Sequence, residues 1–164
     1  MPSTNWPTLL VTAMTILSSA TPALAALCYA DFQSQGSIPP GVLDEHSFHL
    51  DPAFTVKTVD LQGIANGLRT STFSSPPGFV DSRGINLPHF NNENFHLGTA
   101  QVCWFNSDLL QSTHVSLSDA ANDVDNIIGS CCAELEDCPG GVLIQTGDTG
   151  LNITVAVQPA GAAC

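Results

Sequence analysis

Six cysteines constrain this chain more than any other feature, because each disulfide fixes two distant points of a fold. Their positions are Cys28, Cys103, Cys131, Cys132, Cys138 and Cys164. In an oxidising compartment they predict three disulfides, for which about fifteen pairings exist. Each such bond contributes roughly 2–4 kcal/mol to a stability of about 5–15 kcal/mol. We therefore expect a single disulfide-stapled domain in which the bonds reinforce an apolar core.

The start of the chain predicts the export that this oxidation requires. The first 25 residues contain no charged side chain, and their apolar stretch, Leu9–Ala20, leads to a small-x-small sequence that ends at Ala25. This pattern is typical of a secretory signal peptide. A membrane-spanning helix needs about 20 apolar residues, which is longer than this stretch. We expect a signal peptide over residues 1–25, one secreted, extracellular domain over residues 26–164, and no stable membrane insertion.

The adjacent Cys131 and Cys132 narrow the disulfide pairing. They follow a predicted helix, where neighbouring side chains point in different directions, so each is expected to take a different partner. One partner is most simply Cys103 in a predicted strand, and the other is Cys138 in the next loop. The remaining bond then joins the outermost pair, Cys28 and Cys164. Zinc held by Cys132 and Cys138 is the alternative, which an oxidising compartment disfavours.

The charge of the chain excludes two classes of partner. It has 15 acidic and 3 basic residues, for a net charge of −12. With only Lys57, Arg69 and Arg83 as cations, the surface cannot neutralise a run of phosphates, so no nucleic acid is expected as a partner. An anionic membrane surface is disfavoured for the same reason.

Two segments in the second half of the chain have clear secondary-structure patterns. Ser116–Ser130 is a predicted helix, because apolar residues recur at helical spacing and polar residues occupy the opposite face. Ser116 and Asp119 match a capping box with Asp in place of Glu. Gly141–Pro159 predicts a β-hairpin, since two apolar strands flank the turn sequence Gly147–Gly150.

The first half of the mature chain has weaker patterns. Leu27–Phe32 predicts a short strand, and Asp51-Pro52 predicts the start of a helix. Thr70–Asn94 is rich in Ser, Pro, Gly and Asn and predicts a long loop with at most one short strand, which is either a mobile excursion or a binding surface. Phe95–Phe105 predicts a central strand. One face of the first helix is expected to carry Val56, Val59, Ile64 and Leu68. Strands at both ends with helices between them predict the α+β class, as a two-layer α/β sandwich whose antiparallel sheet has two helices on one face.

Patterns that resemble catalytic or metal sites have simpler explanations here. Asp148-Thr149-Gly150 spells an aspartic-protease triplet, but it falls where the predicted hairpin needs a turn. His46 and His49 have a spacing suited to a transition metal, but no second ligand pair accompanies them. His89, His96 and His114 are dispersed, and no Gly-x-Ser-x-Gly nucleophile motif occurs. We expect no enzymatic activity, no metal and no cofactor.

Two polar features are expected at the surface. Asp119, Asp123 and Asp125 predict a solvated helix face rather than a calcium site, because a straight helix does not supply six or more oxygen ligands. Asn152-Ile153-Thr154 is an N-glycosylation sequon. The alternation of the second hairpin strand directs Asn152 away from the core, so this residue is expected to be open to modification.

A resemblance covers the chain from Phe95 to Cys164. A strand containing Cys103-Trp104, an amphipathic helix, the cysteine doublet, a glycine turn and Leu151–Val155 before a terminal cysteine occur in this order. The order resembles that of fungal killer-toxin-like secreted proteins, including the smut-fungus killer toxins and the necrosis-inducing-factor effectors. The resemblance implies an α/β sandwich, secretion by a fungus, and action on a host plant or neighbouring cell without catalysis.

These observations together predict a secreted fungal effector or killer-toxin-like factor. It is expected to bind an extracellular protein or glycan target, with Thr70–Asn94 as part of its contact surface, since binding residues concentrate on loops. The alternative is a secreted carbohydrate-binding protein or cell-wall hydrolase, in which Trp104 or Phe90 stacks on a sugar. Trp104 lies beside Cys103 in a predicted core strand, which favours packing for this residue.

Overall fold

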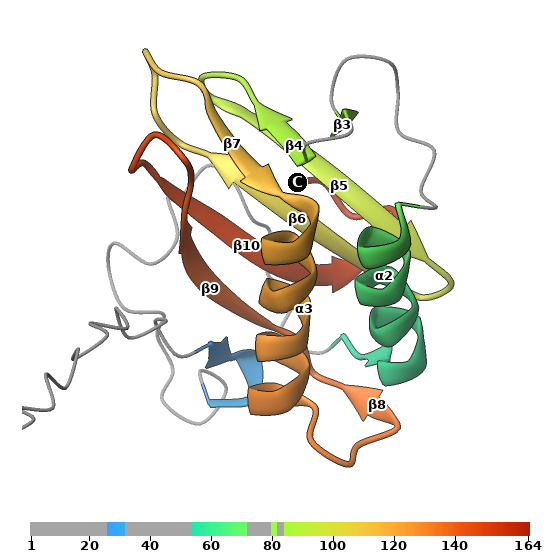
Figure 1. Ribbon diagram of the computed structural model, residues 1–164. Coiled ribbons are helices and arrows are strands. Elements are labelled where there is room, and N and C mark those ends of the chain that lie inside the picture. The colour runs from blue at the N-terminus through green and yellow to red at the C-terminus, as the bar shows by residue number, and fades with distance from the viewer. Residues whose placement is uncertain (1–25, 32–53, 72–79, 82–83) are drawn as a thin grey trace, which may run out of the picture.

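The computed structural model describes residues 26–31, 54–71, 80–81 and 84–164 (Figure 1). Within these residues the elements are β1 (Leu27–Cys28), β2 (Val56–Lys57), α2 (Thr58–Thr70), β3 (Val80–Asp81), β4 (Gly84–Leu87), β5 (Asn91–Leu97), β6 (Ala100–Asn106), β7 (Thr113–Ser116), α3 (Leu117–Cys131), β8 (Asp137–Cys138), β9 (Gly141–Thr146) and β10 (Asn152–Pro159). The strands pair antiparallel in the orders β1-β9-β10-β6-β5, β2-β8 and β3-β4-β7. The predicted α+β class is therefore confirmed.

The C-terminal hairpin lies at the centre of the five-stranded sheet. β10 pairs with β9 on one side and with β6 on the other. Ile153, Val155 and Val157 of β10 are fully buried in the hydrophobic core, whereas Asn152 is exposed. The predicted hairpin is thus confirmed, as are the inward direction of these three residues and the outward direction of Asn152, whereas Ala156 on the outward face is also buried.

The single strand predicted over Phe95–Phe105 is wrong, since the chain forms a hairpin there. β5 ends at Leu97, and β6 starts at Ala100. Gly98 has a φ of 55°, a left-handed conformation that glycine adopts without a steric penalty. The Thr99 backbone N–H and hydroxyl both donate to the Asp60 carboxylate, at 2.7 and 2.8 Å. These contacts fix a turn at Gly98-Thr99. The apolar residues on both sides of this turn made the segment resemble one continuous strand.

The segment Thr70–Asn94, predicted as a long loop with at most one short strand, contains more strand than expected where the structure describes it. Residues 84–87 form β4 and residues 91–94 belong to β5, while residues 72–79 and 82–83 lie outside the described part. Ile85 and Leu87 alternate into the core from β4. The Asn-rich start of β5 pairs with β6, so tertiary pairing overrides its weak strand propensity.

Helix α3 confirms the strongest prediction from the sequence. Ser116 is its N-cap, and the Asp119 N–H donates to the Ser116 hydroxyl oxygen at 3.0 Å. The hydroxyl in turn donates to the Asp119 carboxylate at 2.6 Å. The helix buries the predicted apolar face against the core, including Ala120, Ala121, Val124 and Ile127.

Helix α2 starts later than predicted. It begins at Thr58, because the preceding Val56–Lys57 pairs with β8 as a strand. Asp51 and Pro52, the predicted start, lie outside the described residues. Ile64 and Leu68 are buried as expected, whereas Val56 belongs to β2 and Val59 is 66% exposed. α2 packs against α3, and Arg69 forms an ion pair with Asp125 across the two helices.

Strand β1 is shorter than the strand predicted over Leu27–Phe32. It ends at Cys28, and Tyr29 N–H then donates to the Gly140 carbonyl oxygen at 3.2 Å. Neither α2, with 13 residues, nor α3, with 15, has the length of apolar helix that a bilayer requires.

All six cysteines are paired, as predicted, but two of the three expected pairs are wrong. The observed bonds are Cys28–Cys131, Cys103–Cys164 and Cys132–Cys138. The bond from the doublet to Cys138 is therefore confirmed, whereas the expected Cys103–doublet and Cys28–Cys164 pairs do not form. The reason is strand alternation. Trp104 points toward α3, so its neighbour Cys103 points to the opposite face of the sheet, where the C-terminal residues return.

Candidate binding surface

The residues that resemble a protease triplet serve to join two sheets. Asp148 lies in the β9–β10 turn, and its Oδ1 accepts from the His114 N–H at 3.0 Å and from the Thr113 hydroxyl at 3.3 Å. The Asp148 N–H donates to the His114 carbonyl oxygen at 3.0 Å, and the Thr149 hydroxyl donates to Thr113 Oγ1 at 2.8 Å. The Asp148 carboxylate thus fixes β7 against the hairpin turn, which agrees with the turn predicted at this triplet.

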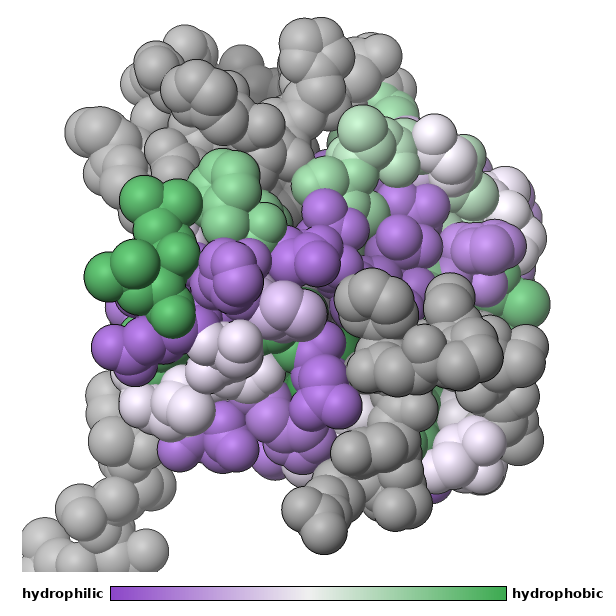
Figure 2. All heavy atoms as spheres, turned by 90° about the horizontal axis from the view of Figure 1, so that it is seen from above, coloured by the Kyte–Doolittle hydropathy of each residue, from purple (hydrophilic) through white to green (hydrophobic). Residues whose placement is uncertain are grey.

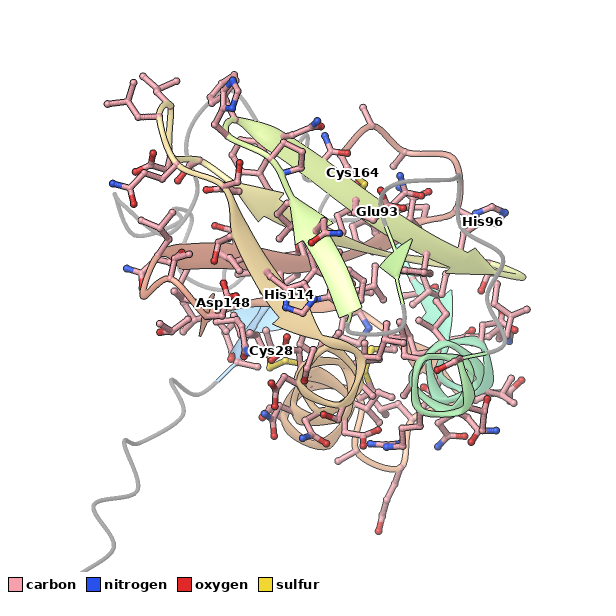
Figure 3. The ribbon with its side chains drawn as sticks, turned by 45° about the horizontal axis from the view of Figure 1, so that its top comes forward. Cys28, Glu93, His96, His114, Asp148 and Cys164 are labelled. Carbon is pink, nitrogen blue, oxygen red and sulfur yellow. A yellow bond between two sulfur atoms is a disulfide. The ribbon has the colours of Figure 1, made fainter. Side chains whose placement is uncertain are left out.

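The dispersed histidines stay dispersed where the structure describes them. Figure 3 shows His96 and His114 on different parts of the molecule, and His89 is exposed next to Phe90. His46 and His49 lie outside the described residues. In the described ranges, no three side chains of His, Cys, Asp or Glu are arranged to hold a metal ion.

The acidic face predicted on the second helix contains one buried member. Asp119 and Asp125 are exposed as expected, but Asp123 is only 3% exposed, so its predicted solvation is wrong. Its carboxylate accepts from the indole nitrogen of Trp104 at 3.3 Å. Burial raises the pKa of Asp123 to about 7. Trp104 is fully buried and packs edge-to-face on Phe95, so the expectation of core packing for this tryptophan is confirmed.

Among the described residues, the two most exposed large hydrophobic side chains are adjacent leucines on the loop between β6 and β7. Leu109 is 67% exposed and Leu110 is 87% exposed. Phe90, on the turn between β4 and β5, is 51% exposed, and its backbone N–H donates to the Asp108 carbonyl oxygen at 2.7 Å. We call Phe90, Leu109 and Leu110 the apolar tip. Figure 2, which views the molecule from above, shows strongly hydrophobic atoms projecting at one edge.

Hydrogen bonds hold the leucine pair in a defined turn. Asp108 Oδ1 accepts from the backbone N–H groups of Leu110 and Gln111, at 2.8 and 2.7 Å. The Asp108 N–H donates to Asn106 Oδ1 at 3.0 Å. A carboxylate that accepts from the backbone N–H groups two and three residues further along the chain is a common way to stabilise a tight turn. The exposed leucines are therefore presented in one backbone conformation.

Asn106 connects this loop to the neighbouring turn. Its side chain is fully buried, and its Nδ2 group donates to the carbonyl oxygens of Leu87, Pro88 and Gln111, at 3.2, 3.1 and 2.9 Å. The first two carbonyls belong to the turn that carries Phe90, and the third belongs to the loop that carries the leucines. One buried amide thus ties together both halves of the apolar tip.

Besides the hydrogen bonds of Asn106, the backbone conformation of Phe90 and a ring contact fix its position. Its φ is 46°, in the left-handed region that non-glycine residues rarely adopt. Its ring packs edge-to-face on Phe105, with ring centroids 5.7 Å apart. Strained backbone persists where the surrounding contacts determine it, and such positions concentrate at binding sites.

A hollow of about 460 Å³ lies beside the leucine pair. It is lined by Ser107, Asp108, Leu109, Leu110, Leu151 and Asn152. The β6–β7 loop forms one wall, and the start of β10 forms the other. The volume falls in the range of small-molecule sites, which is roughly 300–1,000 Å³.

The sequence-based prediction found only part of this surface. Phe90 falls within the predicted contact region Thr70–Asn94 and was also the candidate for sugar stacking. Leu109 and Leu110 were missed. A usable signal was present, since two adjacent leucines stand between the polar residues Asp108 and Gln111, without the periodicity that would bury them in a helix or strand.

Comparisons of the chain with protein-family models, with curated proteins and with solved structures find no match. The function therefore has to follow from the residues and geometry of this chain.

Proposed function

We propose that this is a secreted fungal protein of the effector or killer-toxin-like kind, which acts without catalysis by binding a protein on a host or competitor cell through the apolar tip. The observation that carries the proposal is the exposed pair Leu109 and Leu110 on a turn fixed by hydrogen bonds. Contiguous exposed apolar side chains with a defined backbone are characteristic of interaction sites.

The energetics of the tip favour recognition. Burying a leucine side chain contributes about 1.5–3 kcal/mol, so the pair supplies an anchor for a partner. A loop that is already ordered loses little conformational freedom on binding. The hydrogen bonds of Asp108 and Asn106 are the source of that order.

The scaffold supports secretion. Three disulfides persist in oxidising compartments and are rare in reducing ones. The signal-peptide pattern over residues 1–25 supplies the route of export. We also take the scaffold to be a two-layer sandwich, because α2 and α3 pack on each other and both contact the five-stranded sheet (Figure 1).

The distribution of charge favours a protein partner that is not anionic. The two described cations are engaged elsewhere, Lys57 with Glu136 and Asp137, and Arg69 with Asp125. Among the described residues no cation therefore belongs to the tip, whereas the carboxylate of Asp108 directly precedes its leucine pair. An apolar recess flanked by Lys or Arg would complement this surface.

The test is binding of the labelled mature protein to intact plant and fungal cells. We expect saturable binding that is lost when the cells are first treated with a protease. The double variant Leu109→Ser/Leu110→Ser should lose most of this binding. Val59→Ser is the matched control, because Val59 has nearly the same exposure as Leu109 but lies on α2. Equal binding by the double variant and the control would refute the proposal.

A second candidate function is carbohydrate binding at the apolar tip, and Phe90 is the observation that favours it. An exposed aromatic ring held by Phe105 offers a face on which a sugar stacks. A glycan array separates the two functions. Saturable binding to defined glycans that is lost in Phe90→Ala would favour this candidate over a protein target.

A further inference from the structure

The hollow beside the apolar tip contains a residue that is chemically suited to modification. Asn152 lines the hollow together with Leu109, Leu110 and Leu151. It is also the acceptor asparagine of the sequon Asn152-Ile153-Thr154. The same side chain is thus a wall of the hollow and an attachment point for a glycan.

The strand geometry presents this sequon in an accessible form. Asn152 is exposed, and Ile153 is fully buried, so the side chains alternate away from and into the core. Thr154 points to the same face as Asn152. In the described part of the structure the Asn152 side-chain amide forms no hydrogen bond, so a substituent on its nitrogen would break no contact of the fold.

We propose that Asn152 carries an N-linked glycan whose first sugar residues occupy the hollow and cover one side of Leu109 and Leu110. The glycan then determines how much of the apolar tip is accessible to a partner. This control of access rests on the proposed function, whereas the attachment of the glycan does not require a partner. Attachment of the glycan at Asn152 does not depend on which target the protein binds.

The covalent step is a glycosyl transfer in the secretory pathway. The Asn152 side-chain nitrogen forms a bond to the anomeric carbon of an oligosaccharide carried on a lipid pyrophosphate. The bond from that carbon to the pyrophosphate oxygen breaks, the lipid pyrophosphate leaves, and the amide nitrogen gives up one proton. The step involves no oxidation or reduction.

The hollow has the chemistry of a sugar subsite. Leu109, Leu110 and Leu151 present apolar surface for the C–H face and acetamide methyl of an N-acetylglucosamine. Ser107 and Asp108 present polar groups at the rim for its hydroxyls. The volume of the hollow, about 460 Å³, is within the range of small-molecule sites.

The first measurement is attachment. The full chain is secreted from a eukaryotic host, and its mass is measured before and after treatment with a peptide-N-glycosidase, which converts the attachment residue to Asp. We expect loss of the glycan mass and a peptide with Asp at position 152. Thr154→Ala should abolish the glycan while keeping Asn152, and the matched Thr154→Ser should retain it. A secreted protein with unmodified Asn152 would overturn the proposal.

The second measurement is the position of the glycan. Hydroxyl-radical oxidation rates of Leu109 and Leu110 are compared in the glycosylated protein and in the Thr154→Ala and Asn152→Gln variants. We expect several-fold slower oxidation of both leucines when the glycan is present. Leu135 is the internal reference, since it is exposed on a different loop. Equal rates at Leu109 and Leu110 would show that the glycan leaves the hollow open and would refute its placement.

These two measurements need no binding partner, so their outcome is independent of the proposed binding through the apolar tip. The link to function is tested afterwards with the cell-binding assay. We expect Thr154→Ala to bind several-fold more tightly than the glycosylated protein, with Thr154→Ser unchanged. If both bind equally although oxidation shows the glycan in the hollow, control of the tip by the glycan is refuted while the modification stands.

Discussion

The indole nitrogen of Trp104 donates a hydrogen bond of 3.3 Å to the carboxylate of Asp123, and both side chains are removed from solvent. Burial raises the pKa of Asp123 from 3.8 to about 7. The hydrogen bond from Trp104 lowers this pKa, and the charge of Asp119 raises it, but each effect is smaller than that of burial. In mildly acidic solution the folded chain therefore holds a proton at Asp123 that the unfolded chain has released.

The stability of the protein should depend on pH through this carboxyl group. Its contribution is fully present below the unfolded pKa, near pH 4, and is lost as pH rises through about 7, because only the folded state is protonated in between. Asp123→Asn stays neutral at every pH. We expect its free energy of unfolding, relative to the parent, to increase by up to about 4 kcal/mol between pH 4 and pH 8.

Urea unfolding of parent and variant at several pH values checks this expectation. Asn122→Gln is the control, since Asn122 is exposed on the same helix and neither asparagine nor glutamine titrates. Its stability difference from the parent should stay nearly constant over the same range. A constant difference for Asp123→Asn as well would mean that Asp123 is ionised in the folded protein throughout.

Asp123 also shows where sequence reasoning reaches its limit. Helical spacing placed it with Asp119 on a polar face, yet it borders the apolar stripe that contains Val124 and Ile127. The sequence does not reveal that Asp123 accepts a hydrogen bond from Trp104. A buried tryptophan usually needs an acceptor for its N–H group, and the sequence does not say which residue of α3 lies against Trp104.

The predictions that succeeded depend on local patterns, and those that failed depend on contacts distant in sequence. Helix α3 and the β9–β10 hairpin follow from periodicity, a cap and a glycine turn. The partner of Cys103 depends on which face of β6 meets the helices, and a shift of one residue reverses every side chain of a strand. The order of Leu109 and Leu110 depends on Asn106, whose three acceptors lie on two separate loops.

Two glycines should respond in opposite directions to replacement by alanine. A Cβ at Gly129, inside α3, would meet no atom within 4 Å, so Gly129→Ala should stabilise the protein by about 1 kcal/mol through helix propensity. Gly84 has a φ of 149°, and a Cβ there would clash with the Val115 carbonyl oxygen. Gly84→Ala should destabilise the protein by about 2 kcal/mol or more. Thermal unfolding measures both, and a stabilising Gly84→Ala would contradict the strand geometry of β4.

The disulfides should differ in their contribution to stability. Cys103–Cys164 closes a loop with a sequence separation of 61, whereas Cys132–Cys138 has a separation of 6. Loop-closure entropy then assigns about 4 kcal/mol to the first bond and about 2 kcal/mol to the second. Paired Cys→Ala variants, unfolded in urea without reductant, measure the two losses. Peptide mapping without reduction should recover the three observed pairs, and a Cys28–Cys164 peptide would contradict the fold of both ends.

Asn106 should control the order of the apolar tip. Asn106→Asp keeps the shape of the side chain but replaces the Nδ2 donor with a second oxygen, which then faces the carbonyl oxygens of Leu87, Pro88 and Gln111. Loss of the two N–H donors that these three carbonyl oxygens share, at a fully buried site, should destabilise the protein by about 3 kcal/mol. The more specific effect is local. Backbone amides of Leu110 and Gln111 should exchange hydrogen much faster, and cell binding through the tip should weaken.

The control for this variant separates loss of local order from loss of overall stability. Asp123→Ala removes a buried acceptor from Trp104 in the core and should also destabilise the protein, but it leaves every hydrogen bond of the two tip loops in place. Its amides at Leu110 and Gln111 should keep the protection of the parent under conditions where the protein is folded. If Asn106→Asp and Asp123→Ala affect exchange in the tip equally, the buried amide of Asn106 is not what holds Phe90 and the leucine pair together.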